Sequence, residues 1–329
     1  MSNEVDIREN DILLQDPVLL DILLIDHSRP KTGNQDGHII WATDNYEPLG
    51  QKYQFNYPIE VESITGENGS IIQPRVRKTK AEQQSRARDK GEVFTPSWIC
   101  NHQNNLIDNE WFGKKDVFNT ETANGWISNT TPIKFPSLKG KTWQEYVSEN
   151  RIEITCGEAP YLISRYDTIT GDIIPIYDRI GLLDRKLRVL SENTNDVLEW
   201  FKWALVAYKS TYAYEWQGDN LLLARENALF TFFDYFSDKF KEPHTKDMAR
   251  QIAEIISWNF WQMDGLKGVI PNSCHDEVTK PLLFNDMEEE KRPCPGCEKN
   301  NINAHNGIYC KIMDWEKNEA IRYISLLKR

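Results

Sequence analysis

The sequence predicts an α/β protein with a C-terminal zinc-binding module, and three observations lead to this prediction. Ile152 and Ile154 alternate as in a short strand and are followed by a glycine turn at Gly157. Apolar residues recur at helical spacing between positions 180 and 205 and again between positions 248 and 263. Cysteine and histidine residues near the C-terminus have the spacing of a zinc site.

Length and composition exclude several classes of protein. The 329 residues suffice for one large domain or two ordinary ones. A net charge of −11 argues against nonspecific coating of nucleic acid, although a local basic patch remains compatible with DNA binding. The polar first ten residues do not resemble a signal peptide, and no apolar run approaches the ~20 residues of a membrane helix. We therefore expect a cytoplasmic protein with no membrane partner, in which clustered cysteines bind metal.

Three regions are predicted. Residues 1–72 are expected to form a small α/β or β-rich subdomain, with a helix and a strand in the apolar run 11–26 and a strand at 58–61. Residues 73–272 form the core, which has a loop-rich insertion at 113–150 closed by a short helix near 143–147. Residues 273–329 form the zinc module, which ends in a hairpin.

A basic run at residues 75–90 carries seven Lys or Arg residues against two acidic ones. Such a run is either a solvated helix face or a segment that contacts DNA phosphates. Its seven basic residues, the candidate nucleic-acid contacts, are Arg75, Arg77, Lys78, Lys80, Arg86, Arg88 and Lys90.

The stretch Gly-Glu-Val-Phe-Thr-Pro at residues 91–96 follows this run and opens an amphipathic segment. Read alone, it is a strand edge followed by a Thr-Pro helix start. It also resembles the Phe-Thr-Pro box of adenine-N6 DNA methyltransferases from restriction–modification systems. The resemblance implies a Rossmann-like core that binds S-adenosylmethionine, with Phe94, Thr95 and Pro96 folded over the methionine end of this cofactor.

The glycine turn after Ile154 is similar to the cofactor loop of the same family, Asp-Pro-x-Cys-Gly-x-Gly-x-Phe-Leu. Glu153 takes the place of the Asp, and Cys156 and Gly157 match as they stand. Ile154 in place of Pro and Ala159 in place of the second Gly are departures from the pattern. A glycine turn after a strand lets a cofactor approach the backbone.

Two acidic residues complete the cofactor side of the resemblance. Glu215 precedes Leu223-Ala224-Arg225-x-Asn227, as in the family segment whose acid binds the ribose hydroxyls; a surface acid at a loop is the alternative. Asp264 and Leu266 are similar to the Gly-Asp-x-Leu segment whose Asp accepts from the adenine amino group, although the approach to Asp264 has helical spacing and Asp-Gly is also an ordinary turn.

The catalytic sequence of the family, Asn/Asp/Ser-Pro-Pro-Tyr/Phe, has no counterpart, because the chain contains no Pro-Pro. Three hypotheses remain. The chain is an adenine-N6 DNA methyltransferase or modification subunit that acts on double-stranded DNA. Alternatively, it is a noncatalytic subunit that binds S-adenosylmethionine or DNA and partners a separate catalytic or specificity subunit. In the third, a degenerate core has lost the cofactor and the zinc site stabilises a DNA-binding or structural protein.

The zinc prediction comes from the pattern C-x2-C-x7-H-x4-C. Two cysteines on a tight turn present both sulfurs to one ion, and a His–Cys pair supplies the other half of a tetrahedron. Cys274, with His275 beside it, competes with His305 for the fourth position. We expect a structural site, since four protein ligands leave no position for a water. The predicted ligands are Cys294, Cys297, His305 and Cys310.

Overall fold

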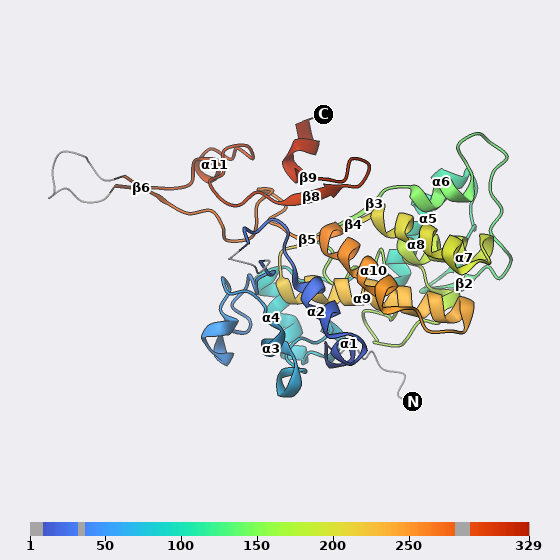
Figure 1. The fold of residues 1–329 in the computed structure, drawn as a ribbon, viewed down its shortest axis with the longest axis horizontal. Coiled ribbons are helices and arrows are strands. Elements are labelled where there is room, and N and C mark those ends of the chain that lie inside the picture. The colour runs from blue at the N-terminus through green and yellow to red at the C-terminus, as the bar shows by residue number, and fades with distance from the viewer. Residues whose placement is uncertain (1–8, 32–36, 280–289, 329) are drawn as a thin grey trace.

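The computed structural model describes residues 9–31, 37–279 and 290–328 (Figure 1). A parallel sheet of three strands in the order β3-β4-β5 lies in the middle of the chain. Ile152 pairs with Tyr212, and Tyr214 pairs with Trp261. This sheet confirms the α/β class, while a Rossmann-like methyltransferase core remains a prediction. Its strands are β3 (Arg151–Ile154), β4 (Thr211–Glu215) and β5 (Phe260–Gln262).

Two helices follow each of the first two strands, because parallel neighbours must be joined by a crossover that returns the chain to the same end of the sheet. The helical spacing of Leu183, Leu187 and Leu190 is confirmed, since all three side chains are fully buried. Thr245 caps the last of these helices by accepting the N–H of Met248. The helices are α7 (Leu182–Asn193), α8 (Val197–Lys209), α9 (Gly218–Phe240) and α10 (Lys246–Asn259).

The N-terminal residues share the core of the rest of the chain. Buried side chains from Ile12 to Ile72 belong to one apolar cluster that continues to Phe260, so the boundary predicted at residue 72 does not separate two cores. The strand predicted at 58–61 is wrong, because a single bridge joins Ile40 to Pro58 before a helix begins. The elements are α1 (Glu9–Gln15), α2 (Pro17–Leu24), η1 (Glu47–Leu49), η2 (Gln51–Tyr53), α3 (Val61–Ile64) and η3 (Gly66–Asn68).

Arg225 of α9 fastens the N-terminal segment to the sheet. Its fully buried guanidinium donates to the carbonyl oxygens of Leu23 and Ile25 at the end of α2, and to those of Ser257 and Phe260 at the end of α10. Carbonyls at helix C-termini have no partner within the helix. One side chain therefore satisfies the ends of two helices and holds them beside β5.

The segments that precede the sheet form short helices and one hairpin. A capping box of Thr79 and Glu82 starts the helix of the basic run, and Gly91 ends it in the left-handed conformation with φ +67°. The short helix predicted near residue 143 is present. The elements are η4 (Arg75–Arg77), α4 (Lys80–Lys90), α5 (Ser97–Phe112), α6 (Trp143–Ser148), and the antiparallel strands β1 (Asn119–Thr122) and β2 (Gly125–Ser128).

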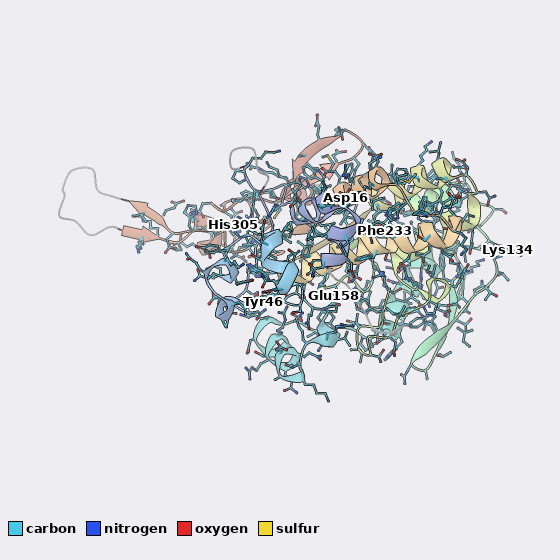
Figure 2. All side chains as sticks on the ribbon, turned by 60° about the horizontal axis from the view of Figure 1, so that its bottom comes forward. Asp16, Tyr46, Lys134, Glu158, Phe233 and His305 are labelled. Atoms are coloured by element: carbon cyan, nitrogen blue, oxygen red, sulfur yellow. The ribbon has the colours of Figure 1, made fainter. Side chains whose placement is uncertain are left out.

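The C-terminal residues form a module that packs against the sheet through a second apolar cluster, which includes Tyr214, Trp261, Ile270 and Ile312. Figure 2 labels His305 in this module, with Lys134 toward the opposite end of the molecule. The final hairpin expected from the sequence is confirmed as β8 and β9. The elements of this module are β6 (Glu277–Thr279), β7 (Glu290–Arg292), α11 (Pro295–Glu298), β8 (Lys311–Asp314), β9 (Glu319–Arg322) and η6 (Tyr323–Lys328). Outside the module, the short helix η5 (Ile176–Asp178) precedes α7.

The described parts of the chain contain no helix that is both long and apolar enough to cross a bilayer. The expectation of a cytoplasmic location partly depended on the polar N-terminus. Residues 1–8 of that stretch lie outside the described residues, and the location stays a prediction.

Two buried carboxyl groups face each other between α1 and α9. Glu9 and Glu226 are at most 1% exposed, and none of their four carboxyl oxygens has a hydrogen-bond partner. Burial raises the pKa of Glu9 to about 8 and raises the pKa of Glu226 as well, and the charge of Glu9 raises the latter further. The native state therefore holds protons here that the unfolded chain releases at lower pH.

We predict that this pair makes the protein less stable as the pH rises. A carboxyl whose pKa is higher in the native state contributes stability below its unfolded pKa, and this contribution is lost as the pH rises toward about 8. Glu9→Gln should remove part of this loss. The difference in the free energy of unfolding between the variant and the wild type should shift in favour of the variant by on the order of 2 kcal/mol from pH 5 to pH 8.5. Urea unfolding at both pH values measures the effect. Asp11→Asn, at an exposed acid of the same helix, is the control and should leave the pH dependence unchanged.

Candidate functional site

A cavity of about 1120 Å³ opens at the carboxyl ends of β3 and β4. Ligands of open parallel sheets bind at this end, where the turns that follow the strands meet. The volume is comparable with that of small-molecule sites. Most of the residues predicted to bind a cofactor line this cavity, namely Phe94, Thr95, Glu153, Cys156, Gly157 and Glu215.

The turn after β3 has a strained backbone. Thr155, Gly157 and Ala159 all have positive φ angles, of 47°, 55° and 62°. The third of these positions is the one where the resemblance expects a second glycine. Alanine in the left-handed region costs about 1–2 kcal/mol, so the backbone at residue 159 has a conformation that glycine would adopt without strain.

Glu215 connects the end of β4 to this turn. Its carboxylate accepts the N–H of Gly157 at 2.9 Å and the N–H of Gln217 at 3.0 Å, one on each oxygen. Burial raises the pKa of Glu215, and the N–H groups of Gln217 and Gly157 act in the opposite direction. A carboxylate has about four acceptor positions, so these N–H groups leave acceptor capacity for donors of a ligand in the cavity.

Glu153 holds the other end of the turn. Its carboxylate accepts the N–H of Leu162 at 3.1 Å and that of Tyr161 at 3.4 Å. Burial raises its pKa to about 8, while the same two N–H groups lower it. Glu153 therefore fixes the return of the chain after the glycine turn, and it changes protonation close to neutral pH.

The Phe-Thr-Pro box lies over the glycine turn. A side chain at Gly157 would contact the Phe94 ring at 3.7 Å, and the guanidinium of Arg75 covers this ring at 4.9 Å from its centroid. The carbonyl of Thr95 accepts the hydroxyl of Thr168 at 2.8 Å, and Pro96 is the residue that precedes α5. The box is thus fixed at both ends and presents its aromatic ring to the turn.

Asp264 is not among the residues that line the cavity. Its carboxylate accepts the N–H of Leu266 at 3.0 Å and lies 3.3 Å from the ammonium of Lys267, so it shapes the turn after β5. The segment before Asp264 was expected to be helical. It is helical only as far as Asn259, where α10 ends, and residues 260–262 form β5. The position of Asp264 outside the cavity therefore does not agree with the predicted contact between this residue and a cofactor.

The sequence did not indicate Asn220 or Asn272, which also line the cavity. The side chain of Asn272 donates to the carbonyl of Ala42 at 3.2 Å, and its φ of +59° places it in the left-handed region. Asparagine is one of the few residues that tolerate this region, and the pair Pro271-Asn272 was the local signal for such a turn.

The basic run is only partly available to DNA. Arg86 is 5% exposed and lies 2.7 Å from Glu92 and 2.6 Å from Asp219, so the prediction that it contacts phosphate is wrong. A buried guanidinium needs carboxylate partners, and these two supply them. Arg75 and Lys78 are half-buried, whereas the exposed members of the run are Arg77, Lys80, Arg88 and Lys90.

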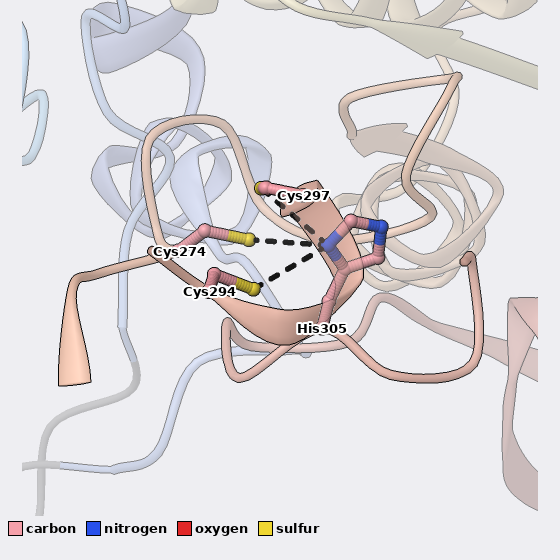
Figure 3. A group of neighbouring side chains, drawn as sticks. All are labelled: Cys274, Cys294, Cys297 and His305. Carbon is pink, nitrogen blue, oxygen red and sulfur yellow. Dashed lines mark hydrogen bonds between the residues drawn. The ribbon is translucent and has the colours of Figure 1, made fainter. Parts of the chain in front are cut away.

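A second group of functional side chains lies in the C-terminal module. Cys274, Cys294, Cys297 and His305 have ligand atoms that all lie within 4.8 Å of one another (Figure 3). The three sulfurs point toward His305 Nδ1 at 3.6, 3.7 and 3.7 Å. Tetrahedral zinc with ordinary bond lengths to sulfur and nitrogen separates these atoms by about 3.6 Å. The four residues could therefore bind zinc as a Cys3His site.

The pairing of β6 with β7 brings Cys274 close to Cys294, since Glu277 pairs with Arg292. Two glycines then let the cluster close. A side chain at Gly296 would come within 2.5 Å of the backbone nitrogen and Nδ1 of His305, and one at Gly307 would lie 2.6 Å from Ser273 Oγ. Gly296, between Cys294 and Cys297, is thus required by packing as well as by the turn.

The predicted ligand Cys310 does not belong to the cluster, and Cys274 takes its place. Cys310 is fully buried in the second apolar cluster, where its thiol donates to the carbonyl of Gln262 at 3.2 Å. Its backbone bonds to Gly268 and Tyr323 direct it toward the sheet. His275, the other alternative, is exposed and lies outside the cluster.

Comparison with protein-family models, curated proteins and solved structures finds no match for this chain. The site is therefore interpreted from its own geometry. That geometry consists of a cavity at the end of a parallel sheet and, in the next module, a possible metal centre of four ligands.

We predict that the purified protein contains roughly one equivalent of zinc, bound by Cys274 and not by Cys310. Cys274→Ser should release the metal, because three ligands remain. Cys310→Ser is the matched control and should retain it. Elemental analysis measures both, and limited proteolysis should show a looser segment 290–328 only in Cys274→Ser. Zinc that disappears in Cys310→Ser instead would contradict the ligand set.

Proposed function

We propose that this chain binds S-adenosylmethionine in the cavity and is similar to adenine-N6 DNA methyltransferases, as the modification component of a restriction–modification system. The observation that carries the proposal is that one cavity is lined by Phe94 and Thr95 of the Phe-Thr-Pro box, by the Cys-Gly turn and by Glu215. These three segments are far apart in the sequence, and each was predicted separately from its resemblance to a cofactor-binding motif.

The chemistry of the cavity suits the nucleoside part of the cofactor. The free acceptor positions of Glu215 fit two neighbouring ribose hydroxyls. The lack of a side chain at Gly157 lets a ligand approach the backbone, and Phe94 offers an apolar surface beside it. The bound cofactor would supply the methyl group, and these residues would hold and orient it.

The catalytic residue remains unassigned, because the sequence has no Pro-Pro followed by an aromatic residue. This absence favours an alternative function, a noncatalytic subunit with a degenerate core, a structural zinc site and a DNA or protein partner. In this alternative a separate catalytic or specificity subunit completes the activity. A methyltransferase and a noncatalytic subunit that retains the cofactor would both bind S-adenosylmethionine, whereas a core that has lost the cofactor would not, so cofactor binding is the first property to test.

We predict that S-adenosylmethionine binds the wild-type chain and that Glu215→Ala weakens binding. The loss of acceptors for two hydroxyls should cost about 1.5–3 kcal/mol, or roughly 10- to 150-fold in affinity. Calorimetric titration measures the affinity, and circular dichroism checks that the variant is folded. Glu199→Ala, at an exposed acid on α8, is the control. A wild-type protein that releases no heat and shows no binding would contradict the proposal.

DNA binding is predicted to depend on the exposed part of the basic run. Lys80→Glu with Arg88→Glu should weaken binding to double-stranded DNA and flatten its dependence on salt, because fewer counterions are released. Lys202→Glu, an exposed lysine of α8, changes the charge elsewhere and should have a smaller effect. Fluorescence anisotropy over a series of salt concentrations measures the slope. An unchanged slope in the double variant would identify the run as a solvated helix face.

A further inference from the structure

β3 is an edge strand with a free side. Parallel strands bond to one neighbour through alternate residues. Arg151 donates its N–H to the carbonyl of Ser210, so residues 151 and 153 face β4, while the backbone groups of Ile152 and Ile154 point away from it. No strand within the described ranges pairs with this side. The N–H and C=O of Ile152 and the N–H of Ile154 are thus placed to receive another strand, since the Ile154 carbonyl accepts the hydroxyl of Thr155.

The surface beside this edge is apolar. Val93, Ile107, Ile152 and Ile154 line the same cavity and are 79%, 41%, 51% and 62% exposed. Proteins often protect an edge strand with exposed charged side chains or with proline. β3 contains no proline, and of its two charged residues the side chain of Arg151 is 13% exposed and Glu153 is 8% exposed. Four large aliphatic side chains beside unpaired backbone groups are the composition of a site for strand addition.

The topology indicates what would cover this edge. Both crossovers move away from it, from β3 to β4 and then to β5. In doubly wound sheets a second half begins on the other side of the first strand, and the ligand crevice lies between the two halves. The cavity lies at the carboxyl end of β3 and has sheet only on the β4 side. It therefore corresponds to one half of such a crevice.

We infer that a separate polypeptide adds a strand parallel to β3 and closes the cavity with the turn that follows its strand. The inference rests on the proposed function, which requires a polar-Pro-Pro-aromatic turn that this chain does not contain. The partner segment is accordingly an aliphatic strand followed directly by that turn. Its aliphatic side chains would cover Ile152 and Ile154, and its turn would reach the space opposite Glu215.

The test uses a peptide library displayed on phage and the full-length chain as bait. We expect enrichment of peptides in which alternating aliphatic residues precede Asn, Asp or Ser, then Pro-Pro and an aromatic residue. A labelled peptide of the enriched sequence should bind at least about tenfold more weakly to Ile154→Lys, which places a charge at the centre of the contact. Ile152→Pro, which removes one edge N–H and keeps an apolar side chain, should also weaken binding.

Ile127→Lys is the matched control, because Ile127 is an equally exposed isoleucine on β2, 67% exposed. Retained zinc and an unchanged circular dichroism spectrum show that each variant is folded. The inference is overturned if the library yields no such motif, if the peptide binds Ile154→Lys as tightly as the wild type, or if sedimentation shows a dimer of this chain that Ile154→Lys abolishes. If the wild type binds the cofactor but the library yields no such peptide, only the docking surface is refuted. If the library yields the peptide but the wild type does not bind the cofactor, only the cofactor site is refuted.

Discussion

The buried guanidinium of Arg86 is the interaction on which the cavity depends. It joins α4 to Glu92 on the cavity wall and to Asp219 at the start of α9, and Tyr46 donates to the same Asp219 carboxylate at 2.8 Å. A buried charge is tolerated only with its partners, and the removal of one partner typically costs about 3–5 kcal/mol. The Phe-Thr-Pro box begins two residues after Glu92, so this ion network helps to set its position over the glycine turn.

The parts of the site that follow the strands were predictable from the sequence. Carboxyl ends of parallel strands meet at one edge of a sheet, so an acid at the end of β4 and a glycine turn after β3 had to approach each other. Gly157 and Glu215 do so, at 2.9 Å. Arg86 was not predictable, because its partners Glu92 and Asp219 are acids that spacing alone does not bring together. In the sequence it differs in no way from its exposed neighbour Arg88.

In the fold and in the metal centre, sequence spacing likewise predicted the local features, whereas contacts between distant segments could not be predicted. Helical spacing predicted α7, α8 and α10, but Arg225 and the shared core, which join the first 72 residues to the sheet, depend on contacts between distant segments. Spacing favoured Cys310 as a ligand because it is near His305. The pairing of β6 with β7 brings Cys274 from twenty positions before Cys294, and Cys310 points into the core instead.

Only one residue separates Asn272, on the cavity wall, from Cys274, in the metal cluster. An ion that orders Cys274 also restricts the backbone of Asn272, whose side chain is fixed to Ala42. Coupling between two binding sites is reciprocal, so a ligand that stabilises this position of Asn272 must tighten metal binding by the same factor. Zinc bound by Cys274 and a ligand that contacts Asn272 would then each strengthen the binding of the other.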